Sequence, residues 1–402
     1  MMGTQLQTDR QSKLLFILFC IGACLLPISK AQTNQPLSQR PPIWSVEPKK
    51  VGYSLSTYRY FRATVGGDRV KIQFLDDRRL ALAWLTPDEI PAKPIGPATN
   101  VPSHLHLAIL DAHTGQQTAS HEWPCSSVGV NLAYTASGQW LLSSDQTITL
   151  YSSLFDEVRD LDNVRTERSH TFVSPSGRTF LSRVSDSHGT WRSQLRDSAT
   201  FDVLDSWNDG RVAKAHLTYS DHFILAQVSG SSNVQRFYLR KVGGDWNPYS
   251  ISVFDSQPPG EIGYGFVNDS TIAGFAGGKL ALQTVEGIEL FNSTLPEAGL
   301  YLSSWSMTAT STQGERFAVI LGRSRGLNNR SLDLYPLQSQ DRVVVYSISK
   351  RSAIYSVKVT GVSPWPTQKH PVWNVIAVSP DGQLLGVVSD EGVRVYVLPP
   401  AE

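Results

Sequence analysis

The chain has 402 residues and a formal net charge of +1, from 36 Lys and Arg against 35 Asp and Glu. This balance gives no electrostatic basis for binding nucleic acid or an anionic membrane surface. Hydrophobic residues make up 41% of the sequence and aromatic residues 10%, which is ordinary for a chain that buries a core. We therefore expect a folded protein without a nucleic-acid partner.

The N-terminal segment has the features of an export signal. Arg10 and Lys13 precede an apolar run over residues 14–28, and the small residues Ser29 and Ala31 follow it. We expect a signal peptide over residues 1–31, cleaved after Ala31, and a secreted or periplasmic protein of the cell envelope that is not inserted in a membrane after cleavage. An uncleaved N-terminal anchor is the alternative, although the apolar run is short for a membrane span.

The cysteines and the segment after the signal set the limits of the folded domain. Cys20 and Cys24 lie in the signal, so the mature chain would keep only Cys125 and could form no intrachain disulfide. Residues 32–50 are rich in Gln and Pro and have few apolar positions, which predicts a disordered linker. We expect a single domain over residues 51–399.

From Tyr53 onward the sequence reads as short strands joined by turns. The clearest unit is the last, where apolar runs at 375–378, 383–388 and 393–398 are separated by turns at 379–382 and 389–392. Runs of β-branched residues between Pro, Asp, Gly and Ser clusters are typical of antiparallel hairpins. No apolar periodicity of an amphipathic helix is sustained anywhere in this region.

Weaker copies of this unit recur upstream. Their first strands begin near residues 70, 131, 171, 213, 264, 306 and 373, and the spacing of about 40 to 50 residues, with two longer gaps, is typical of a four-stranded propeller blade. The last copy has three strands, and Tyr58–Val65 precedes the first copy without a partner. We therefore predict an all-β fold, a seven-bladed β-propeller of four-stranded antiparallel blades, closed by an N-terminal strand (Tyr58–Val65) that completes the last blade. An additional edge strand of a β-sandwich is the alternative for that segment.

Two turns carry a resemblance to a known family. Val378–Leu385 reads VSPDGQLL and Val173–Phe180 reads VSPSGRTF, and both resemble the repeat of bacterial WD40-like and YVTN-type β-propellers. The resemblance extends over about Tyr53 to Leu398 and implies the seven-bladed fold, but no particular activity. The Gly-His and Trp-Asp dipeptides of eukaryotic WD40 repeats are absent.

Two insertions between second and third strands provide the candidate binding residues. Thr86–Ser103 in the first copy contains Asp88, Glu89 and Lys93, and Gly322–Asp341 in the sixth copy contains Arg323, Arg325, Asn328, Asn329 and Arg330. Because the first and sixth copies flank the seventh in a closed ring, we expect both loops on one rim, where they contact a ligand or partner. Surface insertions without a function are the alternative.

Few residues suggest chemistry. His104 and His106 alternate along a strand and so face one side, which makes them weak metal-ligand candidates, but no third ligand lies at a matching spacing and a solvated strand face is the simpler interpretation. Gln73, Asn131 and Asn374 are candidates to face the central channel, and neutral amides are poor acid–base catalysts. We predict no catalytic residue and no cofactor.

We therefore expect an exported, non-enzymatic and monomeric β-propeller that acts as a binding scaffold for a protein, peptide or glycan. The first alternative is a propeller enzyme, either a lactonase-like hydrolase or a quinone-cofactor dehydrogenase, with its site at the central channel. The second alternative is a structural component of the cell envelope. Converging carboxylates or imidazoles at the rim would favour an enzyme.

Overall fold

The computed structural model describes residues 40–52, 70–88, 102–126, 130–144, 146–166, 172–185, 189–208, 210, 212, 215–229, 235–252, 262–276, 279–294, 300–302, 308–311, 315–323, 340–360, 375–389 and 391–400. They belong to one compact unit, residues 38–402. These residues form seven antiparallel sheets, here called blades 1 to 7 in chain order. Among them no helix is long and apolar enough to cross a membrane.

The first four blades each have four strands that pair in chain order. Blade 1 consists of β2 (Val70–Phe74), β3 (Arg79–Pro87), β4 (Pro102–Asp111) and β5 (Gln117–Ser126). Blade 2 consists of β6 (Asn131–Tyr134), β7 (Trp140–Ser144), β8 (Thr147–Tyr151) and β9 (Glu157–Leu161). Blade 3 consists of β10 (Val164–Thr166), β11 (Thr179–Ser185), β12 (Trp191–Asp197) and β13 (Val203–Trp207). Blade 4 consists of β14 (His216–Tyr219), β15 (Phe223–Ser229), β16 (Gln235–Lys241) and β17 (Trp246–Tyr249).

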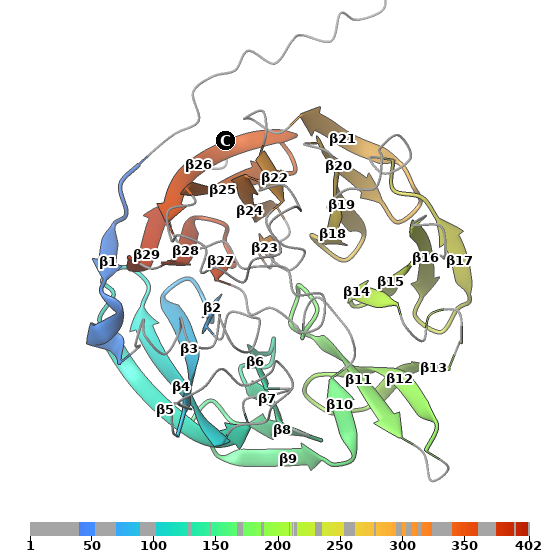
Figure 1. Cartoon of the computed structure of the whole chain (residues 1–402), viewed down its shortest axis with the longest axis horizontal. Coiled ribbons are helices and arrows are strands. Elements are labelled where there is room, and N and C mark those ends of the chain that lie inside the picture. The colour runs from blue at the N-terminus through green and yellow to red at the C-terminus, as the bar shows by residue number, and fades with distance from the viewer. Residues whose placement is uncertain are drawn as a thin grey trace, which may run out of the picture. The chain divides into compact units, whose positions relative to one another are not determined.

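The last three blades complete the ring. Blade 5 consists of β18 (Ile262–Phe266), β19 (Thr271–Ala276), β20 (Lys279–Thr284) and β21 (Glu289–Thr294). In blade 6 the first strand is in two pieces, β22 (Leu300–Leu302) and β23 (Thr308–Thr310), which both pair with β24 (Arg316–Arg323), followed by β25 (Gln340–Ser347) and β26 (Ser352–Thr360). Blade 7 consists of β27 (Ile376–Val378), β28 (Leu384–Ser389), β29 (Gly392–Val397) and the N-terminal β1 (Trp44–Val46), which a 3₁₀ turn (Pro48–Val51) follows. In Figure 1 first strands such as β2, β6, β14 and β18 lie near the centre of the ring and the fourth strands at its outer edge. The predicted seven-bladed propeller is confirmed.

The ring is closed by an N-terminal strand, as predicted, but by a different one. β1 pairs antiparallel with β29, with Trp44 opposite Val395 and Val46 opposite Val393. The expectation that Tyr58–Val65 fills this place is wrong, because the free edge of β29 is already occupied by β1; Tyr58–Val65 lies outside the described residues. The predicted linker 32–50 therefore contains a strand. The register of β1 against β29 is fixed by a contact outside the sheet, since Trp44 Nε1 donates a hydrogen bond to Ala112 O of blade 1 at 2.8 Å.

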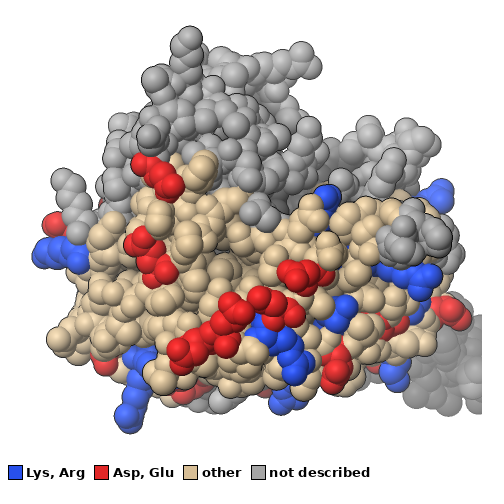
Figure 2. Space-filling view, turned by 90° about the horizontal axis from the view of Figure 1, so that it is seen from below, with Lys and Arg blue, Asp and Glu red and all other residues tan. Residues whose placement is uncertain are grey.

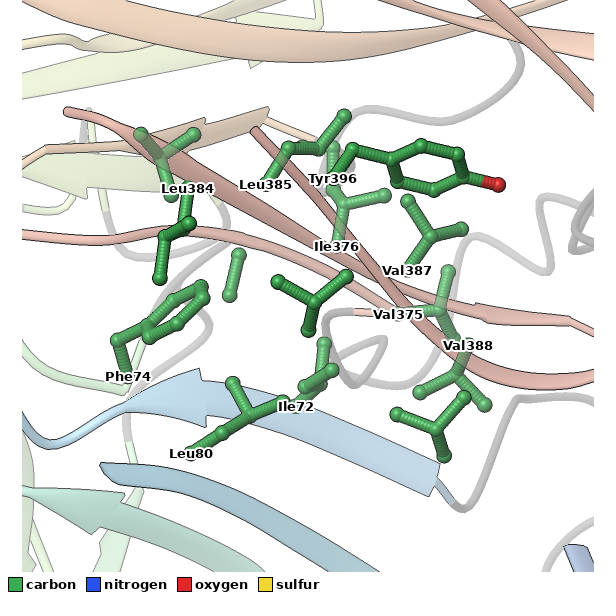
Figure 3. Packing of buried hydrophobic residues seen from close by; sticks show 14 of the residues in the cluster. Ile72, Phe74, Leu80, Val375, Ile376, Leu384, Leu385, Val387, Val388 and Tyr396 are labelled. Atoms are coloured by element: carbon green, nitrogen blue, oxygen red, sulfur yellow. The ribbon is translucent and has the colours of Figure 1, made fainter. Parts of the chain in front are cut away.

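Apolar packing between neighbouring blades forms the core. Figure 3 shows the contact between blades 7 and 1, where Ile72, Phe74 and Leu80 meet Ile376 and Leu385. β19 and β28 are buried along their whole length, because a second strand has a sheet neighbour on each edge and a blade on each face. Burial of this kind supplies about 25 cal/mol per Å² of apolar surface, so it is the main stabilising contribution.

One face of the ring is defined by the turns that join the first and second strands of each blade; we call it the turn face. Such turns of neighbouring blades bond directly. The backbone N–H of Asp381 in blade 7 donates to Asp77 in blade 1 at 3.0 Å, and Ser174 Oγ in blade 3 donates to Asp221 in blade 4 at 2.8 Å. In the blade 7 turn, Gly382 adopts a φ of +72°, a region that favours glycine. The opposite face, where second and third strands are joined, is called the loop face.

Candidate functional site

The two predicted loops both start from the loop face, in blades 1 and 6. They are shorter than expected, because β3 continues to Pro87, β4 begins at Pro102, β24 continues to Arg323 and β25 begins at Gln340. Blades 1 and 6 both contact blade 7. The backbone of Arg323 pairs with Leu300. Its side chain is not described, and Glu89, Lys93, Arg325, Asn328, Asn329 and Arg330 lie outside the described residues, so most of this predicted surface stays a prediction.

At the base of the blade 1 loop, His104 and His106 project to the same side of the sheet, as their alternation predicts. Glu122 of the neighbouring strand β5 lies between them. Its Oε1 is 2.6 Å from His104 Nδ1 and its Oε2 is 3.0 Å from His106 Nδ1. The contact with His104 has the distance of an ion pair but not the geometry of a hydrogen bond. A single carboxylate therefore links both imidazoles.

Two more polar side chains extend this cluster toward the loop. Asp88 Oδ1 lies 3.2 Å from His104 Nε2, and Thr86 Oγ1 lies 2.6 Å from His106 Nε2. Because Nδ1 of neutral His106 faces the Glu122 carboxylate, it carries the proton, and Nε2 is left to accept a hydrogen bond from the Thr86 hydroxyl. Thr86, His106 and Glu122 thus lie in line across three adjacent strands, joined by a hydrogen bond between Thr86 and His106 and a close contact between His106 and the Glu122 carboxylate. We call Thr86, Asp88, His104, His106 and Glu122 the blade 1 cluster.

The surroundings of His106 keep it neutral at pH 7. Its ring stacks on Trp84, with 5.3 Å between the ring centroids. Burial lowers the pKa of His106, because desolvation penalises the imidazolium; the Glu122 carboxylate raises it and His104 lowers it further, and the net shift is downward. A neutral His106 can accept a proton from a neighbouring group or ligand.

Metal binding by this cluster finds no support in its geometry. Within the described part of the chain, no three His, Cys, Asp or Glu side chains are arranged to hold a metal ion. In the blade 1 cluster three of the four imidazole nitrogens, His104 Nε2 and both nitrogens of His106, lie next to an oxygen of Asp88, Glu122 or Thr86, and this arrangement fits a polar recognition surface.

The first strands of blades 1 and 2 are tied together by polar side chains near the channel. Gln73 Nε2 donates to Tyr134 O at 3.0 Å, and Tyr134 N donates to Gln73 Oε1 at 3.1 Å. Lys71 Nζ donates to Leu132 O in the same way, and desolvation lowers its pKa to about 8. Gln73, which we predicted to face the channel, is therefore used to hold two blades together; Asn131 is buried, and Asn374 lies outside the described residues.

The outer edge of the ring at blade 2 is acidic. Figure 2 shows Asp and Glu side chains across the middle of this side, with several Lys and Arg side chains among them, and β9 lies at the lower edge of Figure 1. Glu157 of β9 has a raised pKa, because the charge of Asp160 opposes its ionisation.

Comparison with known proteins assigns no family to the chain. No family model and no curated protein sequence matches the chain. Among solved structures it is similar to the WD40 domain of Toxoplasma gondii coronin, with 8% identity, a TM-score of 0.47 and coverage of 83% of this chain and 82% of that one. A functionally unknown protein from Desulfotomaculum acetoxidans gives 12% identity, a TM-score of 0.47 and coverage of 73% and 91%. Hydrazine synthase from Kuenenia stuttgartiensis gives 12% identity, a TM-score of 0.42 and coverage of 83% of this chain and 96% of that one. The class of protein, a seven-bladed β-propeller, is defined by its own seven sheets.

Proposed function

We propose that the protein is an exported interaction scaffold whose loop face binds a protein, peptide or glycan. The observation that carries this proposal is the contrast between the two faces. Polar groups of the turn face bond from blade to blade, as Asp77 and Asp221 do. In the blade 1 cluster the polar groups bond within one blade and stay accessible, with Asp88 and Glu122 exposed to 45% and 49%. Groups of this kind on rigid strands are suited to recognition.

The cluster offers a partner a defined set of interactions. Two carboxylates accept hydrogen bonds, and the imidazoles donate or accept according to their protonation. Because the pKa of His106 is lowered, the charge of the cluster becomes more positive below neutral pH, and binding should change in that range.

Two further parts of the proposal come from the sequence. The turns at 379–382 and 174–177 support a relationship to bacterial YVTN-type propellers, and the N-terminal segment supports export. Sequencing the N-terminus of the protein from its source tests export: cleavage after Ala31 is expected, and an intact Met1 would contradict it.

Photo-crosslinking from the two faces of one blade tests the binding surface. A photoreactive amino acid replaces Asp88 on the loop face or, as the matched control, the exposed His113 in the turn between β4 and β5 on the turn face. We expect adducts with exported proteins or glycans of the source from position 88 and not from position 113. Equal labelling, or labelling from position 113 alone, would reject the loop face as the binding surface. Replacing 324–339 by a short Gly-Ser linker then tests the blade 6 loop, and loss of the adduct would support its role.

A second candidate function, hydrolysis of an ester or lactone, is favoured by the order of hydroxyl, imidazole and carboxylate in Thr86, His106 and Glu122. Nucleophilic hydrolases use this order. Thr86 Oγ1 would attack the carbonyl carbon while His106 Nε2 takes its proton and returns it to the leaving alcohol. Water would then hydrolyse the acylated Thr86. This site lies on the outer strands of blade 1, away from the channel that the sequence suggested for an enzyme.

The hydrolase reading has a simple test. Turnover of p-nitrophenyl acetate is compared for the wild type, Thr86→Val and, as a control in the same blade, Thr118→Val, whose hydroxyl bonds to Ile109 O. A hydrolase would lose its activity in Thr86→Val and keep it in Thr118→Val. Equal rates in all three proteins would reject hydrolysis at this site. The interaction scaffold would then be the remaining proposal.

A further inference from the structure

A second polar group lies on blade 3, where the strands reach the loop face. Arg165 of β10 is directly opposite Arg183 of β11. Trp191 begins β12 opposite Ser185, two residues beyond Arg183, so all three side chains lie on the same face of the sheet. The guanidinium carbon of Arg165 is 4.6 Å from the centroid of the Trp191 ring, and that of Arg183 is 5.8 Å away. Both cations thus contact one indole.

This pair of arginines has no compensating carboxylate within the part of the chain that the structure describes. Like charges directly opposite each other on neighbouring strands are destabilising. Among the described residues no carboxylate forms an ion pair with Arg165 or Arg183, and the Nε of Arg183 is buried without a hydrogen-bond partner. A buried donor without a partner is destabilising. The described part of the chain therefore leaves charge and hydrogen-bonding capacity at this place unused.

An arginine of blade 4 that faces the same side of blade 3 differs in having a partner carboxylate. Arg240 of blade 4 also contacts Trp207 and Trp246, but its Nε and Nη2 donate to Asp205 at 2.9 and 2.8 Å. That ion pair closes the contact between blades 3 and 4, and its side chains are only 12% and 5% exposed. Arg240 thus contacts aromatic rings and also has a partner carboxylate, whereas Arg165 and Arg183 contact an aromatic ring without a carboxylate partner among the described residues.

The facing side of blade 4 adds positive charge. Arg236 of β16 pairs with Val228, which packs into the apolar cluster between blades 3 and 4, so Arg236 projects toward blade 3. Like Arg165, it lies where its strand meets the loop face, and Arg236 is exposed.

We propose that Arg165 and Arg183, oriented by Trp191, form a binding site for a doubly charged tetrahedral oxyanion, the phosphate monoester group of a ligand on the loop face. Packing on an indole uses the flat face of a guanidinium and leaves its in-plane N–H groups free to bind two oxygens at once. Two cations next to each other match a group of charge near −2 better than a carboxylate of charge −1. This site is separate from the blade 1 cluster, so either proposal can fail without the other.

The test uses inorganic phosphate and sulfate as probes, with acetate for comparison, added to the full-length chain at constant ionic strength. Binding is followed by NMR through the Nε–Hε signals of arginine. Arg165→Lys and Arg183→Lys assign the two signals and keep the charge while removing the planar donor pair. Arg178→Lys, an exposed arginine in the turn-face turn of the same blade, is the matched control.

We expect saturable shifts of the Arg165 and Arg183 signals with phosphate and sulfate, and weaker binding by about tenfold in either lysine variant but not in Arg178→Lys. Trp191→Phe, which preserves an aromatic ring, should weaken binding less than the arginine variants do. The proposal is overturned by equal affinity in all variants, by shifts that do not saturate, or by acetate binding as tightly as phosphate.

Discussion

Replacement of Gly392 by alanine should open the ring at its closure. Gly392 begins β29 with a φ of +121°. A Cβ at this position would lie 2.3 Å from Val46 O of β1, a separation that real Cβ atoms do not reach. The obstacle is backbone, so β1 must move away from β29.

The expected loss follows from the contacts that β1 makes. Displacement removes the 2.8 Å hydrogen bond from Trp44 Nε1 to Ala112 O, worth about 1 kcal/mol. Trp44 and Val46 are half-buried against the core of blades 7 and 1, and each loses about 1 kcal/mol of apolar burial. The alanine at positive φ adds about 1 kcal/mol of strain. The total is about 4 kcal/mol.

Gly287 provides the matched control, since it has a φ of +84° in a turn of blade 5 and nothing lies within 4 Å of its virtual Cβ. Gly287→Ala should therefore lower the free energy of unfolding by about 1 kcal/mol, from backbone strain alone. Urea unfolding measures both free energies of unfolding. If Gly392→Ala and Gly287→Ala destabilise the protein equally, the reasoning about the closing strand is refuted.

Three other changes test the blade contacts and the buried charges. Asp205→Asn should lower the free energy of unfolding by about 3 kcal/mol at pH 7, since Arg240 would keep a nearly buried charge. Burial alone would raise the pKa of Asp205, but hydrogen bonds from Arg240 and from backbone N–H groups lower it on balance, so this contribution is present above about pH 4 and should be lost as the pH falls further. Asp221→Ala removes the acceptor for three hydroxyl groups of blade 3 and should cost about 1–3 kcal/mol in urea unfolding, whereas the exposed Asp245→Ala should cost little. For Lys71, the folded state releases a proton above about pH 8 that the unfolded state holds to about pH 10, so stability should rise with pH in this range and Lys71→Met should abolish the rise.

The sequence predicted the inner strands of the blades well, for a physical reason. Second strands such as β19 and β28 are buried on both faces, so apolar and β-branched residues form a continuous run between turn residues. The turn at 379–382 carries its own geometry, because Ser379 Oγ donates to Asp381 at 2.6 Å and accepts from Leu384 N at 2.8 Å. Information of this kind is local and can be read without the fold.

The fourth strands of blades 1, 2 and 4 were missed for the opposite reason, whereas those of blades 3, 5 and 6 were predicted. β9 has the sequence EVRDL and four of its five residues are exposed, and β17 and β5 are also mostly polar. An outer strand has one free edge and much of its surface in water, so few of its positions need to be apolar. Pairing with the third strand forms these elements, and that pairing depends on the blade as a whole.

The closing strand was assigned wrongly because its selection is not local. Tyr58–Val65 is rich in aromatic and β-branched residues and reads as the better strand. Trp44–Val46 is short and follows two prolines, but it fits a groove in which Gly115, with a φ of +73°, leaves room for the Trp44 ring. A Cβ on Gly115 would lie 2.7 Å from that ring. Both Trp44 and Gly115 can be seen in the sequence, but nothing in the sequence shows that they are in contact.

The candidate sites show the same limit. The alternation of His104 and His106 could be read from the sequence, whereas Glu122 and Thr86 join them through the register of three strands. Arg165, Arg183 and Trp191 are likewise brought together by register, across segments with no shared motif. Residues that meet across a sheet leave no spacing signal, so sequence analysis finds the strand but not the site.

The most direct test of the closed ring is a disulfide between β1 and β29. Ser45 and Arg394 lie opposite each other in the register, and cysteines at these positions, in a chain whose natural cysteines are replaced, should form an intramolecular disulfide on mild oxidation. Arg62→Cys with Arg394→Cys tests the strand that the sequence favoured. The ring closed by Trp44–Val46 predicts a disulfide from position 45 and none from position 62; the reverse result would contradict it.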